Sequence, residues 1–378
     1  CEDLAMGDGF IPVNKPLLDG NEKKYLNECI DSGWISSEGP FVDRFEKEFA
    51  ARVGCKYGVA VANRSVALDA AVSACGIGPG DEVIVPTFTI VSCAAAIVRA
   101  GATPVLVDSD PATWNMLPSQ VEARITSRTR AIMVVHIYGL PVDMAPIQAM
   151  ARKRGITIIE DAAEMHGQTY RQRPCGSLGD IATFSFYPNK HVTTGEGGMI
   201  VTDDAGLAEN SRSLRNLCFN PKRAFVHDEL GWNFRMSNLQ AAVGLAQLER
   251  LDEFVARKRA MGALYDRLLG DLAEIHRPQK STDAADNIYW VYGVVLDETA
   301  AFDAEEAMRR LSAKGVGTRA FFWPMHEQPV FRRMGLFADE RYPTAERMGR
   351  RGFYLPSGLG LSNAEIERSA QALREVLT

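Results

Sequence analysis

The sequence predicts an α/β protein whose large domain is built on a seven-stranded, mainly parallel sheet. Short runs rich in valine and isoleucine recur through the first 200 residues, and helical patterns separate most of them. Most of these runs are apolar at every position, which is typical of parallel strands covered by helices on both faces. At ~150 residues per domain, a chain of 378 residues also has room for a smaller companion domain.

Seven strands are expected in the large domain, together with helices that begin at recognisable signals. The strands span residues 57–62, 82–86, 103–108, 130–136, 156–161, 181–187 and 198–202. A helix at 17–30 has one apolar face with a period of 3.6 residues, made of Tyr25, Leu26, Cys29 and Ile30. A second helix, at 66–75, opens directly after Asn63-Arg64-Ser65.

A long periodic pattern at 238–269 is expected to run from the large domain into a smaller one. A strand at 290–296 and a helix at 304–314 follow it. The closing helix at 362–377 begins with a capping box, Ser362 with Glu365. Its buried stripe should hold Ile366, Ala370, Leu373 and Leu377. We therefore divide the chain into a large domain, residues 1–250, and a smaller α+β domain, residues 251–378.

The composition argues against several classes of protein. The net charge is -6 and no dense run of lysine and arginine occurs, so we expect no nucleic-acid surface. The apolar stretches fall short of the ~18 residues of a membrane span, and we recognise no secretory leader. The seven cysteines are scattered without zinc-ligand spacing, so we expect no metal site. Free thiols in a reducing cytoplasm are the expected state.

Candidate catalytic residues lie where strands end, because ligands of an open parallel sheet bind at the carboxyl ends of its strands. The strand at 156–161 ends in Asp161, and Glu164 follows three residues later. The strand at 181–187 leads into Lys190 and a glycine-rich turn. A lysine buried there would lose pKa, and its neutral amine would be a nucleophile toward carbonyl carbon.

Lys190 and Asp161 together fit the needs of pyridoxal phosphate. This cofactor requires a lysine that bonds its aldehyde, an aspartate that holds its protonated ring nitrogen, and helix N-terminal amides for its phosphate. Either residue alone is most often structural. Their placement on successive predicted strands, 29 residues apart, favours the cofactor hypothesis.

The stretch at 185–198, SFYPNKHVTTGEGG, resembles the lysine signature of the DegT/DnrJ/EryC1/StrS sugar aminotransferases. Further matching segments follow in the family's order along nearly the whole chain: residues 34–39 (WISSEG), 78–83 (GPGDEV), 160–164 (EDAAE), 231–236 (GWNFRM) and 323–326 (WPMH). The resemblance implies a fold-type-I, pyridoxal-phosphate-dependent enzyme. It also implies transfer of an amino group from glutamate to a nucleotide-linked keto sugar. Within the family, the likeness points to GDP-4-keto-6-deoxymannose as the acceptor, with other GDP-, dTDP- or UDP-linked keto sugars as the alternative.

The resemblance also implies roles for individual residues. Lys190 would bond the cofactor and carry protons, and Asp161 would pair with the ring nitrogen. Glu164 would lie beside the ring hydroxyl, while Ser185 and the amide of Ser65 would bind the phosphate. Asn233 would reach the cofactor phosphate of a neighbouring subunit, which implies a homodimer or a tetramer built from dimers.

Substrate contacts are expected from four residues in two segments. The family positions of Arg319 and His326 favour substrate-side contacts. Lys222 and Arg223 are candidate cations for a diphosphate, although a solvated loop is the alternative interpretation. His191 is adjacent to Lys190 and therefore expected to point elsewhere.

Two positions depart from the family pattern. Arg64 stands where the family has glycine in the phosphate-binding turn, and arginine lacks the conformational freedom of glycine. Its side chain would either add charge to the phosphate or point away. Ile90 stands where the family places an aromatic residue over the cofactor ring, and isoleucine packs on a ring without stacking.

Two other classes of protein are alternatives to the aminotransferase. The glycines at 76, 78 and 80 resemble a dinucleotide-binding loop, but they precede a strand instead of following one and lack the third spacing. A regulator on the same scaffold would need an added DNA-binding module, for which the chain has no room.

Overall fold

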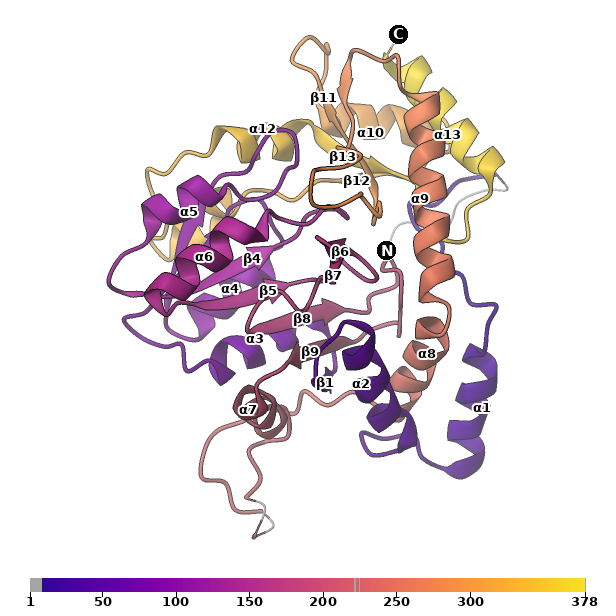
Figure 1. Ribbon diagram of the computed structural model, residues 1–378. Helices are drawn as coiled ribbons and strands as arrows, with labels where there is room; N and C mark the ends of the chain where they lie inside the picture. The colour runs from indigo at the N-terminus through magenta and orange to yellow at the C-terminus, as the bar shows by residue number, and fades with distance from the viewer. Residues whose placement is uncertain (1–8, 221, 224, 378) are drawn as a thin grey trace.

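The computed structural model describes residues 9–220, 222, 223 and 225–377. A central seven-stranded sheet carries helices on both faces, and a smaller group of strands and helices lies beyond one end of it (Figure 1). None of the helices in the described ranges has the length and hydropathy of a bilayer-spanning segment.

The large sheet is mainly parallel, as predicted. Its strand order is β1-β9-β8-β5-β4-β2-β3, and β9 is the strand of this sheet that runs antiparallel to its neighbours. All seven expected strands are present: β1 Tyr57–Val61, β2 Glu82–Pro86, β3 Thr103–Val107, β4 Thr129–Val135, β5 Thr157–Asp161, β8 Ile181–Ser185 and β9 Gly198–Thr202. The six parallel strands therefore end at one common edge.

Alternate residues of the strands enter two separate apolar cores, which explains why the strands are apolar throughout. In β4, Ile132 and Val134 belong to one core, whereas Met133 and Val135 belong to the other. The first core is completed by α2 (Pro40–Arg52), α5 (Pro118–Arg124), α6 (Met144–Arg154) and α8 (Asn238–Leu248). The second is completed by α3 (Arg64–Ala74) and α4 (Val91–Arg99), with α7 (Ala205–Arg215) beside α3.

The N-terminal helix differs from its prediction in two respects. Helix α1 spans Glu22–Ser32 rather than 17–30, and Gly33 ends it in a left-handed conformation. Tyr25 and Cys29 are buried against α8, but Ile30 is 63% exposed, so its assignment to the buried face was wrong. The contact with α8 covers a narrow face, and Ile30 lies about 100° around the helix from Cys29.

The expected long helix is two helices that link the domains. Helix α8 is followed by α9 (Leu251–Leu268) after a break at Glu249 and Arg250. The start of α9, at Leu251 and Val255, belongs to a large-domain core, whereas Met261, Leu264 and Tyr265 belong to the core of the small domain. Figure 1 shows α9 running along the side of the molecule from α8 up to α13 (Asn363–Leu377).

The small domain is built on an antiparallel sheet with the order β10-β11-β13-β12. Its strands are β10 Ile275–His276, β11 Tyr292–Leu296, β12 Arg319–Ala320 and β13 Gly352–Leu355. Its other helices are α10 Ala304–Ala313, α11 Pro329–Arg333 and α12 Pro343–Arg351. A short hairpin in the large domain, β6 Thr169–Tyr170 with β7 Arg173–Pro174, completes the strands.

For the small domain, the predicted capping box is confirmed, the predicted buried stripe is confirmed at three of its four residues, and the boundary at residue 250 does not separate all contacts. Ser362 and Glu365 form the capping box of α13, in which each side chain accepts a backbone N–H of the other. Ile366, Ala370 and Leu373 are buried, whereas Leu377 is only partly buried. Ile11 also lies in the small-domain core and bridges to Val316, so the start of the described chain packs with residues beyond 250.

Candidate active site

The candidate site lies at the edge of the large sheet where the parallel strands end. Strand β5 ends at Asp161 and pairs with β8, which places Asp161 opposite Thr183. Strand β8 ends at Ser185, and the turn after it is closed by a hydrogen bond from the N–H of Lys190 to the carbonyl of Tyr187, 2.9 Å long. Helix α3 begins at the same edge, because it follows β1.

The amine of Lys190 is buried, and it faces a carboxylate and an indole ring. Its Nζ lies 3.6 Å from Oε1 of Glu164 and 3.6 Å from the ring centroid of Trp290. Burial lowers the pKa of Lys190 to about 8, against the opposing effect of Glu164. Roughly a tenth of such an amine is uncharged at pH 7, and the uncharged form attacks carbonyl carbon or accepts a proton.

Glu164 is held in place from both sides. Its Oε2 accepts the backbone N–H of Tyr138 at 2.7 Å, and its other oxygen faces Lys190. Tyr138 follows β4 with a φ of 53°, a left-handed conformation that few bulky residues adopt. Burial raises the pKa of Glu164, and the charge of Lys190 opposes that rise. The glutamate and the lysine therefore stabilise each other's charged forms in a dry environment.

Asp161 is almost fully buried and is engaged by the guanidinium of Arg64. Nε of Arg64 donates to Oδ1 of Asp161 at 3.3 Å, and Nη2 makes an ion pair with Oδ2. The same guanidinium donates to Ser92 Oγ at 2.6 Å. The structure thus places Arg64 in neither of the two expected positions, because its side chain points inward at the acid of the site. Arg64, the first residue of α3, pairs with Asp161 because a buried carboxylate is stabilised by a cation.

The other residues expected at the cofactor lie around this pair. Ser185 is buried, and its Oγ accepts the N–H of Tyr187 at 3.4 Å. Ser65 is exposed in the first turn of α3, where backbone N–H groups have no intrahelical partner. Ile90 is 41% exposed at the start of α4. An anion at the α3 N-terminus would meet free amides and the positive end of the helix dipole.

Asn233, Lys222 and Arg223 make no hydrogen bond or ion pair with Lys190 or Asp161 among the described residues. Asn233 is exposed, bridges to Asn216 at the end of α7, and accepts a hydrogen bond from Arg235 at 2.9 Å. Lys222 and Arg223 are exposed on the loop after α7, which Figure 1 shows extending away from the sheet edge that carries Lys190. Within one chain, these three residues are not brought to Lys190.

Arg319 and His326 differ in their exposure to solvent. Arg319 is exposed on β12 and pairs in register with Tyr354, whose ring lies 6.1 Å from Trp290. His326 is buried, with Nδ1 2.9 Å from Thr87 Oγ1 and Nε2 3.2 Å from Oε1 of Glu346. Both ring nitrogens of His326 are therefore engaged within the protein, while Arg319 keeps an exposed guanidinium.

His191 lies in the interior behind Lys190, in agreement with the expectation that it points elsewhere. It is buried, and neither ring nitrogen has a partner among the described residues. Its neighbours are His166, with ring centroids 6.3 Å apart, and the buried Lys258, whose Nζ donates to the carbonyl of Trp290 at 2.8 Å. Burial lowers the pKa of His191, so it stays neutral.

Sequence reasoning missed several residues of the site. Trp290 was expected only as the start of a strand, and Tyr138 was not considered. Tyr138 lies three residues beyond the end of β4, and this position next to a strand end is a signal that could have identified it. Ser92 and Cys93 carry no comparable signal, because they reach Arg64 and Asp161 only through the packing of α4.

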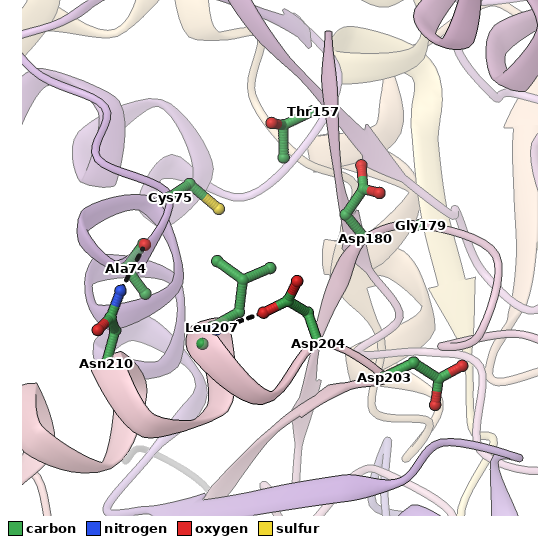
Figure 2. A pocket seen from close by; sticks show the side chains of 10 residues that line it. Ala74, Cys75, Thr157, Gly179, Asp180, Asp203, Asp204, Leu207 and Asn210 are labelled. Carbon is green, nitrogen blue, oxygen red and sulfur yellow. Dashed lines mark hydrogen bonds between the residues drawn. The ribbon is translucent and has the colours of Figure 1, made fainter. Parts of the chain in front are cut away.

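A separate hollow of about 520 Å³ lies at the opposite edge of the sheet. Figure 2 shows it between α3 and α7, with Asp180, Asp203 and Asp204 around it. Asp204 caps α7 by accepting the N–H of Leu207 at 2.9 Å, and Asp180 accepts the N–H of Ile158 at 2.8 Å. These acidic groups serve the fold, and their charge does not suit an anionic ligand.

Replacing Glu164 by glutamine should lower the pKa of Lys190 further, by about one pH unit, because an opposite charge at this distance favours the ammonium by at least that much. The wild-type pKa is about 8, so the variant should hold more neutral amine at pH 7. The pH dependence of reductive methylation of Lys190 in the cofactor-free protein, followed by peptide mass spectrometry, measures this. Glu196→Gln, at an exposed position, is the control and should leave the midpoint unchanged. A midpoint that stays fixed or rises in Glu164→Gln would contradict the prediction.

The fold and the site together define a class: an α/β enzyme with a partly neutral lysine and a buried aspartate at the carboxyl edge of a mainly parallel sheet. The chain belongs to the DegT/DnrJ/EryC1/StrS aminotransferase family, whose family model matches residues 16–374. The suspected resemblance is thus confirmed, and the protein is an aminotransferase.

Similar proteins cover nearly the whole chain. GDP-perosamine synthase of Caulobacter vibrioides is 45% identical over 97% of this chain and 98% of that protein. The aminotransferase TlmJ of Streptoalloteichus hindustanus superimposes with a TM-score of 0.90 at 32% identity, over 97% of this chain and 98% of the other. DesI, solved in the presence of its TDP-sugar product, gives a TM-score of 0.87 at 33% identity, over 98% and 93%. The likeness within the family extends, as expected, to GDP-perosamine synthase.

Aminotransferases of this family depend on pyridoxal phosphate, and the donor set of the site fits that cofactor. A buried amine, a buried carboxylate and the open amides of a helix N-terminus lie at one sheet edge. One feature does not fit directly: Arg64 already pairs with the carboxylate that the ring nitrogen needs.

Proposed function

We propose that this aminotransferase uses pyridoxal phosphate to move an amino group from glutamate to GDP-4-keto-6-deoxymannose, giving GDP-perosamine. The observation that carries the proposal is the buried amine of Lys190, with its pKa lowered to about 8, at the same sheet edge as Asp161. The near full-length likeness to an enzyme named GDP-perosamine synthase supports the choice of substrate.

Six residues of one chain would contact the cofactor. Lys190 would bond its aldehyde, Asp161 would face its ring nitrogen, and Ser185 with the amide of Ser65 would take its phosphate. When bound, the cofactor supplies an electron-accepting ring that stabilises negative charge on the substrate carbon. Glu164, which accepts the backbone N–H of Tyr138, would lie beside the ring hydroxyl of the cofactor. Ile90, exposed at the start of α4, would pack on the ring.

Proton transfer is the task of the Lys190 amine. Once the amine of glutamate has displaced it from the cofactor aldehyde, its free Nζ would take the proton from the α-carbon of glutamate, which its lowered pKa permits near neutral pH. Glu164, 3.6 Å away, stabilises the ammonium that results. The carboxylate of Asp161 would accept a charge-assisted hydrogen bond from the protonated ring nitrogen and so keep that nitrogen protonated. Water would supply the carbonyl oxygen of 2-oxoglutarate, which would leave first while the amino group stays at the site. The keto sugar would then take up the amino group and lose its oxygen as water, so the two substrates would react in turn.

We also propose a homodimer, or a tetramer built from dimers, with active sites shared between subunits. Asn233, Lys222 and Arg223 are exposed and make no hydrogen bond or ion pair with Lys190 of their own chain, so they are available to a neighbour's site. Nearby apolar side chains support a subunit interface: Trp34, Ile35, Phe225, Leu230 and Trp232 are all exposed. The mass of the native protein by light scattering checks the number of chains.

Substrate recognition would rest on cations. Lys222 and Arg223 from the neighbouring subunit, and Arg319 from β12, would face the diphosphate and sugar. His326 would act indirectly, since both of its ring nitrogens are engaged. The protein would work in the cytoplasm, which the free thiols of the six described cysteines support. Cell fractionation with an antibody tests that location.

A panel of keto sugars tests the proposed reaction. The protein, supplied with pyridoxal phosphate and glutamate, should aminate the GDP-linked 4-keto-6-deoxy sugar at least 10-fold faster than its dTDP- and UDP-linked counterparts, with products read by mass spectrometry. The alternative is a different or longer nucleotide-linked keto sugar. Two observations are reasons to include such sugars in the panel. One is the similar protein DesI, solved with a TDP-sugar product, and the other is the unusual pair of residues Arg64 and Ile90. Preference for a dTDP- or UDP-linked sugar would establish that alternative, and amination of none would overturn the proposal.

A further inference from the structure

Asp161 has no open position for another hydrogen-bond donor in this structure. Its Oδ1 accepts the N–H of Ala163 at 3.2 Å and Nε of Arg64 at 3.3 Å. Its Oδ2 accepts Sγ of Cys93 at 3.2 Å and pairs with Nη2 of Arg64. A carboxylate offers about four acceptor positions, so all of them are taken. A ring nitrogen can bind Asp161 only if one of these donors leaves.

Among the donors, Arg64 is the one able to leave. The N–H of Ala163 is backbone, two residues from Asp161 and fixed by the turn after β5. Cys93 has a short side chain on α4 and no reach beyond its present neighbours. Arg64 reaches Asp161 through a long flexible side chain from the first turn of α3. Replacing one cation by another also keeps the buried carboxylate paired, whereas leaving it unpaired is costly.

The guanidinium of Arg64 lies inside the candidate site, between α4 and β5. It donates to Ser92 Oγ at 2.6 Å and to Cys93 Sγ at 3.2 Å on α4, while it pairs with Asp161 on β5. Its charge also reaches the other two ionisable groups, because it lowers the pKa of both Lys190 and Glu164. Arg64 is 8% exposed and thus fills space between α3, α4 and β5.

We propose that Arg64 is a stand-in cation, which pairs with Asp161 in the cofactor-free protein and is displaced by the ring nitrogen when pyridoxal phosphate binds. The inference rests on the proposed function, since it assumes that this cofactor is the ligand. Arg64 stabilises the empty protein, because it satisfies a buried carboxylate. It weakens and slows cofactor binding, because the Arg64–Asp161 pair must break first.

Two variants of Arg64 test the exchange without any activity measurement. Arg64→Gly removes the side chain, and Arg64→Gln keeps much of its length without the charge. The cofactor-free melting temperature should fall by about 3 °C or more in both, because ~1 kcal/mol corresponds to about 2–4 °C in domains of this size. Pyridoxal phosphate, titrated and followed by the visible absorption of the lysine-bound aldehyde, should bind at least 10-fold more tightly and faster to both variants.

The chain offers a matched control pair on the same two helices. Arg99 of α4 donates to Asp69 of α3 through Nε and Nη2, at 2.9 and 2.6 Å, on the surface. Arg99→Gly should change the affinity for pyridoxal phosphate by less than twofold. If the substitutions acted by a general loosening of these helices, the affinity for pyridoxal phosphate would instead change in Arg99→Gly as it does in the Arg64 variants.

The outcomes separate the two proposals. Weaker binding of pyridoxal phosphate to both Arg64 variants would overturn the exchange and make Arg64 a direct cofactor ligand. Unchanged melting temperature and unchanged affinity would show that the Arg64–Asp161 pair has no part in cofactor entry, which also overturns it. If the wild-type protein and every variant fail to bind pyridoxal phosphate, the proposed function itself fails.

Discussion

Replacing Lys190 by alanine should reduce amination of the GDP-linked keto sugar by at least ~10³-fold, within the range that loss of a general acid–base group produces. The variant loses the amine that would bond the cofactor and the base that moves the α-proton, and no nearby group replaces both. Lys258 is the other buried lysine close by, but its Nζ donates to the carbonyls of Trp290 and Ser357. Initial rates with glutamate and the keto sugar, read by mass spectrometry, measure the loss.

A second measurement on Lys190→Ala separates the chemical role from folding. Borohydride reduction should attach the cofactor covalently to Lys190 of the wild-type protein and leave the variant unlabelled at that peptide. Lys153→Ala, at an exposed position on α6, is the control and should keep the wild-type rate and labelling. Full activity in Lys190→Ala would show that the catalytic amine lies elsewhere.

Replacing Asp161 by asparagine should lower the rate by ~10²–10³-fold, because an amide cannot hold a proton on the ring nitrogen by charge. It should also destabilise the cofactor-free protein by about 3 kcal/mol, the low end for breaking a buried ion pair by removing one partner. That second effect follows from Arg64, whose buried guanidinium would lose its counterion. Steady-state rates and chemical unfolding of the cofactor-free protein measure the two effects.

The surface pair Arg99–Asp69 again supplies the comparison for Asp161→Asn. Asp69→Asn removes the carboxylate of an arginine pair whose arginine is largely exposed, so it should cost under ~1 kcal/mol and leave the rate unchanged. The double variant Arg64→Gly with Asp161→Asn should regain part of the lost stability, since it buries neither charge. A loss in the double variant equal to the sum of the losses in the two single variants would show that Arg64 and Asp161 do not depend on each other.

The sequence predicted the sheet well because the signal for each strand is local. A run such as residues 130–136 is apolar at every position, and the structure buries its alternate residues in two different cores. Helix boundaries were less certain. Helix α1 began five residues later than expected, and the pattern at 238–269 was interrupted at Glu249 and Arg250. A periodic pattern shows which residues are apolar but not how wide a face the neighbouring helix covers.

The residues of the candidate site were likewise predicted where the sequence signal is local and missed where packing decides. Lys190, Asp161 and Glu164 were expected together because residues that end parallel strands meet at one edge. Trp290 and Cys93 come from other elements and reach the site only through packing. The direction of the Arg64 side chain was left open, and the structure shows a third arrangement in which it pairs with Asp161.

By itself, the sequence determined the α/β fold and the residues that meet at the sheet edge, since these depend on local apolar patterns and on the order of strands. The aminotransferase family was indicated by the resemblance of its motifs to known sequences. Only the tertiary structure decided that Arg64 occupies the hydrogen-bond positions of Asp161 that Ala163 and Cys93 leave open. It also decided that both ring nitrogens of His326 have partners inside the protein. Those facts depend on which side chains compete for the same buried partner. The free energy of a buried charge is set by its neighbours in space, and no spacing along the chain identifies them.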